Sequence, residues 1–347
     1  MKIPDKAYMD FSGGIRRDKS PILLKDNELQ SGKNFDIDEQ GRIIKRRGMQ
    51  AFGNLASSFF NMATFYNSSV ASATRVGNYI VDSSSNVYLL STTNLTNAVT
   101  AGQTTAITLD GIGGFSSTNP STVEIEGDII TYTGITGATL TGVSGVTSAH
   151  AVGAPVHQWV AGSGVTTGTQ GSYFSILNEN LLLNTSTDVY NEDDHSDAAF
   201  ANAATQPQVL FLTTFKTRCY GAGNGLVAIA SSPTTRIFYS AINDGTTWTP
   251  ASDYFDVEDT TNEPVTGLKE YSNFLMIFKW NSMHRYNLAS LTQVNNQVGA
   301  WNHFCPQEIN KLLYTFSPAG IFVTNGESTQ NIGEPVKEYW KNFQPIF

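Results

Sequence analysis

Cysteine and charged side chains are scarce in this sequence. The chain of 347 residues has two cysteines, too few for a disulfide scaffold, so we expect a reduced protein made in a cytoplasm. Charged residues make up 15% of the chain, against roughly 25% in an average soluble domain, which excludes a coiled coil or a long-helix protein. No stretch approaches the ~20 consecutive apolar residues that cross a bilayer. Because no hydrophobic run follows Met1 either, we expect neither a membrane span nor a secretory signal.

Positive charge is also scarce over most of the chain and is concentrated at its N-terminus. The net charge is −9, and residues 76–215 contain no lysine or arginine over 140 positions. Such a surface releases few counterions from a phosphate backbone, the step that dominates nucleic-acid affinity. Residues 1–50 hold 11 lysines and arginines against 8 acidic residues. Because these acids are interleaved with the bases, we expect residues 1–50 to contact a protein surface or solvent rather than nucleic acid.

Short apolar strands separated by Gly, Asn, Asp, Ser and Pro recur along the chain. In each repeat a continuous apolar strand, typical of burial on both faces, is followed by a more mixed strand that ends in or near Tyr. The spacing is roughly the 40–50 residues of a propeller blade, apart from one long gap. The pattern predicts an all-β fold, a β-propeller of five or six blades, with a β-sandwich as the alternative. The strand pairs are residues 77–81 with 87–90, 179–184 with 188–190, 225–230 with 236–240, 272–278 with 283–286, and 319–324 with 331–332.

The long gap, residues 93–158, is rich in Thr, Gly, Ser, Ala, Val and Ile. We interpret it as a small β-module inserted into a connection of the propeller, where long insertions are tolerated. After the last repeat, Pro335 can begin a short helix with Val336, Tyr339 and Phe343 on one face. The expected organisation is an N-terminal docking arm (1–50), a propeller (51–92 and 159–333), the inserted module (93–158) and a C-terminal short helix (334–347).

No motif in the sequence indicates catalysis or a cofactor. One acidic run, within residues 192–197, comes nearest to a metal site. Carboxylate oxygens at this density suit Ca²⁺. The run lacks the glycine and the alternation of a calcium loop, so an exposed acidic loop is the favoured interpretation. The phrase from Asn243 to Trp248 is similar to the Asp-box turn of sialidase-type propellers, which is structural there. We expect no enzyme activity, no cofactor and no metal; the acidic residues are Glu192, Asp193, Asp194 and Asp197.

Two sets of residues resemble bacteriophage tail proteins. The first resembles the nozzle family (tail tubular B-type, or tail hub) of short-tailed phages. Its N-terminal part is Phe11, Gly13, Gly14, Pro21, Asn34, Gly41, Arg46, Arg47 and Gly48, and its blade part is residues 236–240, Trp248, 256–257, 267–268, 275–279 and Tyr286. The second set resembles a short β-module that recurs in phage tail and fibre proteins. It consists of residues 123–134, 140–143 and 149–151.

The nozzle resemblance implies a virion structural protein, made in the host cytoplasm, that forms a homo-hexameric ring below the phage adaptor, or head–tail connector. DNA would pass through the ring during genome ejection without specific binding, and tail fibres are a further partner. The alternatives are a carbohydrate-binding or hydrolysing propeller for host recognition, or a tail or stopper component of a long-tailed phage. The assembly residues implied are Gly13, Gly14, Arg16, Arg17, Arg46, Arg47 and Gly48.

Replacing the four arginines Arg16, Arg17, Arg46 and Arg47 together by glutamate tests their role as intersubunit ion-pair donors. We expect the variant to remain a folded monomer but to be excluded from the ring, because each attractive pair becomes a like-charge contact. Native mass spectrometry would report ring formation and circular dichroism the fold. Normal ring assembly by the variant would refute the role.

Overall fold

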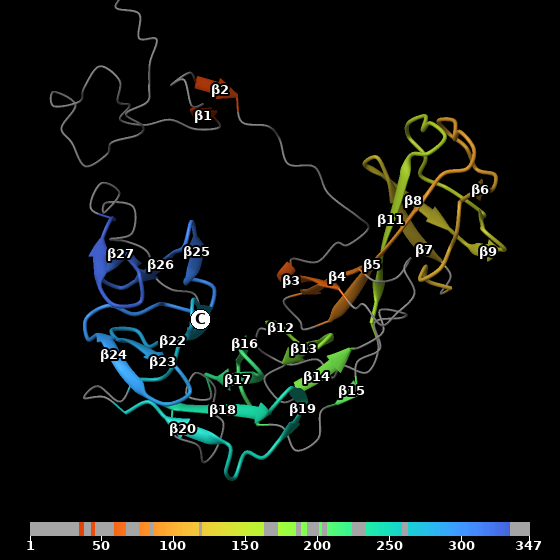
Figure 1. Cartoon of the computed structure of the whole chain (residues 1–347). Helices are drawn as coiled ribbons and strands as arrows, with labels where there is room; N and C mark the ends of the chain where they lie inside the picture. The colour runs from red at the N-terminus through yellow and green to blue at the C-terminus, as the bar shows by residue number, and fades with distance from the viewer. Residues whose placement is uncertain are drawn as a thin grey trace, which may run out of the picture.

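The computed structural model describes residues 35–37, 43–45, 59–66, 76–82, 86–117, 120–162, 173–184, 189–192, 201–202, 207–223, 234–258 and 263–333. Every regular element in these ranges is a β-strand, and the strands form successive antiparallel sheets (Figure 1). The predicted all-β propeller with a small inserted β-domain is therefore confirmed. None of these residues forms a helix that could span a membrane. The C-terminal helix expected within 334–347 lies outside the described residues.

Four sheets have their strands paired mainly in chain order, as propeller blades do. One comprises β12 (Tyr173–Leu177), β13 (Asn180–Asn184), β14 (Val189–Glu192) and β15 (Ala201–Asn202). The next comprises β16 (Phe211–Phe215), β17 (Arg218–Ala222), β18 (Arg236–Ala241) and β19 (Asp244–Trp248), with β20 (Tyr254–Asp256) also paired to β18. The third comprises β21 (Gly267–Tyr271), β22 (Phe274–Phe278), β23 (Met283–Tyr286) and β24 (Leu291–Asn295). The last comprises β25 (Gln307–Ile309), β26 (Leu312–Ser317), β27 (Gly320–Thr324) and β28 (Thr329–Asn331).

A fifth sheet begins with β3 (Phe59–Tyr66), β4 (Val76–Asp82) and β5 (Val87–Asn94) and takes β11 (Pro155–Ala161) as its fourth strand. The five sheets follow one another along an arc, each facing the next (Figure 1). Four of the five strand pairs expected from the repeat are paired in the structure, as β4–β5, β13–β14, β22–β23 and β27–β28. Residues 225–230 of the remaining pair lie outside the described residues, and among the described strands β18 pairs with β17, β19 and β20.

The second strand of a blade is buried on both faces because it lies between two neighbouring sheets. In β13, Leu181 and Leu183 pack in a cluster with Phe65 and Tyr79 of the preceding sheet. Leu182 points the other way, into a cluster with Trp248 of the following sheet. Strand β22 is similarly divided between two clusters. This arrangement explains why such strands read as continuous apolar runs rather than as alternating ones.

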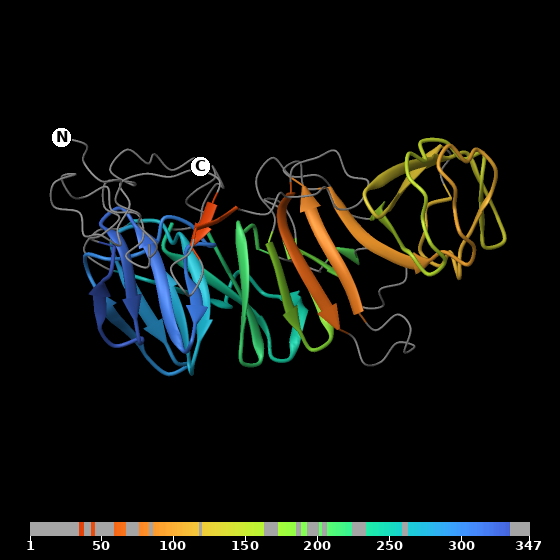
Figure 2. The same ribbon diagram turned by 90° about the horizontal axis from the view of Figure 1, so that it is seen from above.

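The inserted module has a core of its own. Its strands are β6 (Ile107–Thr108), β7 (Ser121–Ile125), β8 (Asp128–Tyr132), β9 (Gly134–Thr136) and β10 (Thr139–Thr141). Strands β6, β10 and β9 form one small sheet, and β7–β8 extends the first blade's sheet through β11. The buried side chains include Val123, Ile125, Ile130, Tyr132 and Leu140. Figure 2 shows the module at one end of the molecule, beyond the first blade.

A buried amide joins the module to the blade. The side chain of Gln158, on β11, is fully buried. The two N–H groups of its amide are shared among three acceptors, Ser121 Oγ at 3.0 Å, the Thr122 carbonyl at 2.9 Å and Tyr132 Oη at 2.9 Å, while its oxygen accepts from Ser116 N at 2.7 Å. A buried polar group that is fully hydrogen-bonded in this way fixes the geometry around it. The module is therefore held by β11 and its network as well as by its own core.

Residues of the blade phrase noted in the sequence meet in space. Arg236 on β18 donates from Nε and Nη2 to the two carboxylate oxygens of Asp256 on β20, at 2.8 and 2.9 Å. The guanidinium also lies 3.6 Å from the ring centroid of Tyr254. Trp248 is buried and donates from Nε1 to the Gly245 carbonyl at 2.8 Å. In this structure all of these residues hold one blade together.

Replacing Asp256 by Asn is expected to lower the free energy of unfolding by about 1–2 kcal/mol, because a paired, partly buried, charge-assisted contact is lost. Glu327→Gln is the matched control. Glu327 meets Arg285 at 3.4 Å from an exposed position, so its loss should cost less than about 0.5 kcal/mol. Urea unfolding of both variants measures the difference, and equal midpoints would contradict the structural role of the Arg236–Asp256 pair.

Candidate functional site

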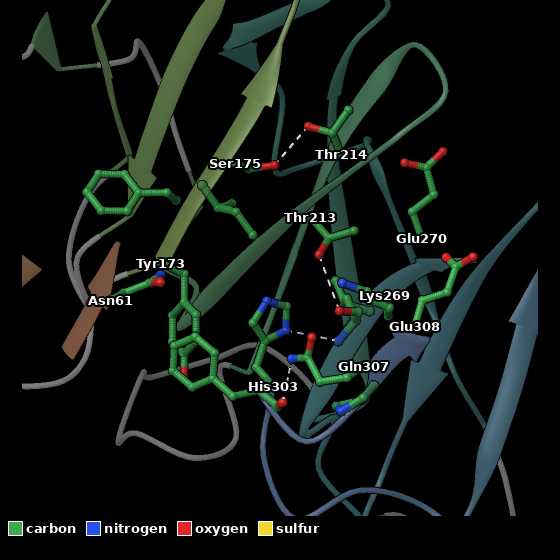
Figure 3. Close-up of a pocket in the computed structure, with 15 residues that line it drawn as sticks. Asn61, Tyr173, Ser175, Thr213, Thr214, Lys269, Glu270, His303, Gln307 and Glu308 are labelled. Carbon is green, nitrogen blue, oxygen red and sulfur yellow. Dashed lines mark hydrogen bonds between the residues drawn. The ribbon is translucent and has the colours of Figure 1, made fainter. Parts of the chain in front are cut away.

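A cavity lies where the first strands of adjacent blades converge. Strands β12, β16, β21 and β25 line it, with Asn61 of β3 at one side, and it encloses about 360 Å³. Figure 3 shows two contrasting walls, with Tyr173 on one side, Glu270 and Glu308 on the other, and Thr213 and His303 between them. Propeller proteins present such inner strands toward the axis, where side chains of several blades can converge on one ligand.

Hydroxyl groups rather than ion pairs connect the inner strands at this cavity. Ser175 Oγ of β12 and Thr214 Oγ1 of β16 share a hydrogen bond of 2.8 Å. Thr213 Oγ1 donates to the Leu268 carbonyl of β21 at 3.2 Å. Each of these bonds crosses from one blade to the next, so the cavity wall is a continuous hydrogen-bonded surface made of three blades.

His303 lies at the centre of this surface and is held as a neutral imidazole. Its Nδ1 accepts a hydrogen bond from the Leu268 backbone N–H at 3.2 Å, so this nitrogen carries no proton. The ring stacks on Phe211 with centroids 4.7 Å apart and meets Tyr173 edge-on at 4.7 Å. Burial foremost, and then the positive charge of Lys269, lower the pKa of His303 to about 3, although a backbone hydrogen bond with Leu212 opposes the shift.

The local sequence provides the close approach that His303 needs. A Cβ at Gly267, the first residue of β21, would lie 3.2 Å from the His303 Cα. A side chain at this position would therefore push the turn that carries His303 away from β21. The two adjacent residues, Leu268 and Lys269, both line the cavity, so glycine at 267 is what lets the turn pack against them.

The opposite wall carries the charge of the site. Glu270 and Glu308 line it together with Lys269. The pKa of Glu270 is raised, first because burial removes part of its hydration and also because the Glu308 carboxylate lies nearby; a backbone N–H of Lys216 and the charge of Lys269 oppose the rise. One lysine against two glutamates leaves this wall with a net charge of −1.

A second titratable cluster lies in the inserted module. The buried His150 ring is held between two carboxylates, with Nδ1 at 3.0 Å from Glu126 and Nε2 at 3.0 Å from Asp128. Asp128 also accepts from the hydroxyl and backbone N–H of Thr147 and from the backbone N–H of Ser148. These hydrogen bonds, the Thr147 hydroxyl foremost, lower the pKa of Asp128 to about 2 although burial opposes them. The cluster pins the turn at 147–150 to β8.

The site residues expected from the sequence lie mostly outside the described residues. All seven assembly residues of the N-terminal arm do so, and the two strands described in the arm, β1 (Phe35–Ile37) and β2 (Ile43–Lys45), form an antiparallel hairpin. In the acidic run, Glu192 ends β14, and Asp193, Asp194 and Asp197 lie outside the described residues. Among the residues that the structure describes, no group of three or more His, Cys, Asp or Glu is placed to hold a metal ion.

Two further sequence features have structural roles. In the Asp-box-like turn, Asp244 Oδ1 accepts from the N–H and the hydroxyl of Thr246, at 2.8 and 2.7 Å. A Cβ at Gly245 would collide with Leu182 of the neighbouring blade. Cys219 is fully buried, and burial raises the pKa of its thiol to about 12, so it packs as a small apolar side chain.

The cavity itself was not predicted from the sequence. Its polar residues come from five sheets, and those of different sheets lie far apart in the sequence. A signal was available, since Thr213, Glu270 and Glu308 all belong to the first strand of a blade. Aligning the repeats on their apolar second strands and collecting the polar residues just before them would have pointed to this wall.

Neither a protein-family model nor a curated protein matches the chain. Solved structures similar to it include BamB from Moraxella catarrhalis, at 10% identity and a TM-score of 0.35, with 80% of this chain and 74% of that chain covered. The WD40 domain of Neurospora crassa Pan2 has 12% identity and a TM-score of 0.34, with 67% and 75% covered. The extracellular domain of the putative hybrid two-component system BT4673 from B. thetaiotaomicron has 11% identity and a TM-score of 0.35, with 80% and 34% covered.

The chain thus spans about a third of the length of that extracellular domain. All of these TM-scores are below 0.5 and all identities below 25%. The description of this chain as a propeller therefore relies on its own blade-like sheets, and the site is interpreted from its own residues.

His303 is expected to make stability depend on pH. Its pKa is lower in the folded state than the ~6.5 of an unfolded chain, so its contribution is complete above pH 6.5 and is lost as the pH falls toward 3. Between pH 7 and pH 5 the free energy of unfolding should therefore fall by roughly 1–2 kcal/mol, and by the smaller amount if the ring keeps some solvent contact. The variant His303→Asn retains an acceptor for the Leu268 N–H but has no titrating ring. It should therefore lack this pH-dependent loss of stability. Urea midpoints at both pH values test it, and identical pH slopes in the two proteins would contradict it.

Proposed function

We propose that this chain is a structural part of a phage tail, the nozzle or hub ring below the adaptor, through which the genome leaves. The observation that carries the proposal is the exposure of Ile309 and Leu312 on the last blade, together with that of Met62 on the first blade. A free-standing propeller closes its first blade against its last, whereas a part of an assembly leaves such surfaces for neighbours. The resemblance of the N-terminal arm and the blade phrase to tail nozzle proteins supports the same assignment.

The last blade has one covered and one uncovered face. Leu313 and Phe322 pack against the preceding blade. Leu312, adjacent to Leu313 and so on the opposite face, is 38% exposed, and its partner Ile309 on β25 is 54% exposed. Burying the two side chains would contribute on the order of 2–4 kcal/mol to an interface.

The first blade exposes one apolar side chain at the other end of the row, although Ile80, the cross-strand partner of that residue, is buried. Phe65 on β3 packs toward the second blade. Met62, on the opposite face of the strand, is 73% exposed. Exposed apolar side chains at each end, formed by different residues, suit a head-to-tail contact between copies, and head-to-tail contacts generate rings when the rotation closes.

The charge distribution supports passage of DNA without retention. The net charge of −9 and the 140 consecutive residues without lysine or arginine leave little surface that could grip phosphates. In this proposal the basic N-terminal arm contacts the adaptor or the adjacent subunit, and the module at the end of the molecule (Figure 2) is the part placed to meet tail fibres.

The double variant Ile309→Asp with Leu312→Asp tests the ring. We expect it to remain monomeric under conditions in which the unaltered chain forms a ring, because two buried charges oppose the contact. Ile242→Asp is the matched control, since Ile242 is 60% exposed in the β18–β19 turn, away from both ends of the row. Native mass spectrometry gives the stoichiometry, and rings of the double variant as abundant as those of the control would contradict the interface.

The location is tested separately. Cryo-electron microscopy of virions, labelled with an antibody to this chain, should place it as a ring on the tail axis. Labelling confined to peripheral fibres, or a channel lined by lysine and arginine, would contradict the conduit role even if the purified protein forms rings.

A further inference from the structure

We propose that the cavity between the inner strands binds a neutral saccharide unit, which stacks on Phe304 and is hydrogen-bonded by Glu270 and Glu308. The proposal concerns the isolated chain and does not depend on the nozzle assignment. It follows from the chemistry of the two walls, their charge and the size of the cavity.

One wall is aromatic and partly open to solvent. Phe304 is 38% exposed and lies tilted beside Tyr173, with ring centroids 4.7 Å apart. Tyr173 is in turn fixed by its edge-on contact with His303. Fixed aromatic rings with one accessible side offer a flat apolar surface at little conformational cost. A pyranose ring presents a matching apolar face of C–H groups.

The other wall offers hydrogen-bonding groups of both kinds. The carboxylates of Glu270 and Glu308 accept, and the Lys269 ammonium donates. The Gln307 side chain is oriented by a bond of 2.8 Å from its nitrogen to the Phe304 carbonyl, so its amide stays beside the aromatic wall. Sugar hydroxyls both donate and accept, and a site that combines an apolar platform with a few such polar groups is typical of ligand pockets.

Charge narrows the ligand class. The wall carries a net charge of −1, and the pKa of Glu270 is raised by burial and by Glu308. An added carboxylate would be repelled from both glutamates, so uronic and sialic acids are disfavoured. The volume of about 360 Å³ lies at the lower end of the range for ligand pockets, which fits one or two sugar units rather than a long chain segment.

The cavity also has the rigidity that recognition needs. Hydrogen bonds join its strands across blades at Ser175–Thr214 and Thr213–Leu268, and His303 joins the turn before β25 to β21. The groups on the two walls therefore keep a fixed separation, and a ligand would lose little free energy in ordering them.

Ligand-observed saturation-transfer NMR and calorimetry on the purified full chain test the proposal. The probes are neutral hexose and N-acetylhexosamine oligosaccharides, with galacturonate oligosaccharides and a lysine ester as the anionic and cationic comparisons. We expect binding of at least one neutral saccharide in the millimolar range or tighter and none of the anionic probe. Phe304→Ala and Glu308→Gln should each weaken the affinity by about tenfold or more.

Ile176→Ala is the matched control, because Ile176 is 41% exposed and adjacent in the chain to the cavity residue Ser175 without lining the cavity. It should bind like the unaltered chain. Thermal unfolding of each variant checks the fold. If Phe304→Ala is destabilised, the saccharide affinity of Glu308→Gln alone decides whether the cavity is the binding site. Three results would overturn the proposal: no neutral saccharide binds, the lysine ester binds in preference to every saccharide, or both cavity variants bind as tightly as the control. Each of these three binding results can be measured whether or not the protein forms rings, so the proposal is tested independently of the proposed nozzle function.

Discussion

The structure depends on the burial of one apolar strand per blade between two neighbouring sheets. In β13, Leu181 and Leu183 are covered by the preceding sheet and Leu182 by the following one. A single four-stranded sheet cannot cover both faces of such a strand, so no blade is stable without its neighbours. Stability is therefore shared along the row, and a change in one blade is transmitted to the adjacent blades through the clusters that they share.

The same constraint locates both surfaces to which we assign a role. At the ends of the row, Met62 and Leu312 are exposed, because no further sheet of the described residues packs there. Along the inner edge the first strands converge, and space for apolar packing gives way to hydroxyl bonds between blades such as Ser175–Thr214. An architecture that buries the middle of each blade thus leaves its ends for protein contacts and its inner edge for a polar cavity.

The sequence predicts features that lie within one short stretch of chain better than features that are assembled from distant residues. The continuous apolar strands and their partners are local, and four of the five expected pairs are present. The cavity is assembled from Thr213 on β16, Glu270 on β21, and His303 and Glu308 of the last blade, and these three blades bring their residues together only through the stacking of the sheets. His303 accepts a hydrogen bond from the Leu268 backbone N–H of the neighbouring blade. The position of His303 in the cavity wall could not be predicted from the sequence, because it depends on how the blades stack.

The insertion shows how a repeat architecture accepts an extra unit without weakening a blade. Strands β5 and β11 remain paired over seven residue pairs, from Asn94 with Pro155 to Tyr88 with Ala161. The module therefore begins and ends at adjacent positions, so little loop-closure entropy is added. Because β11 also pairs with β7 and carries the Gln158 network, the module continues the sheet instead of hanging from a linker. Its orientation relative to the first blade is thus fixed by strand pairing.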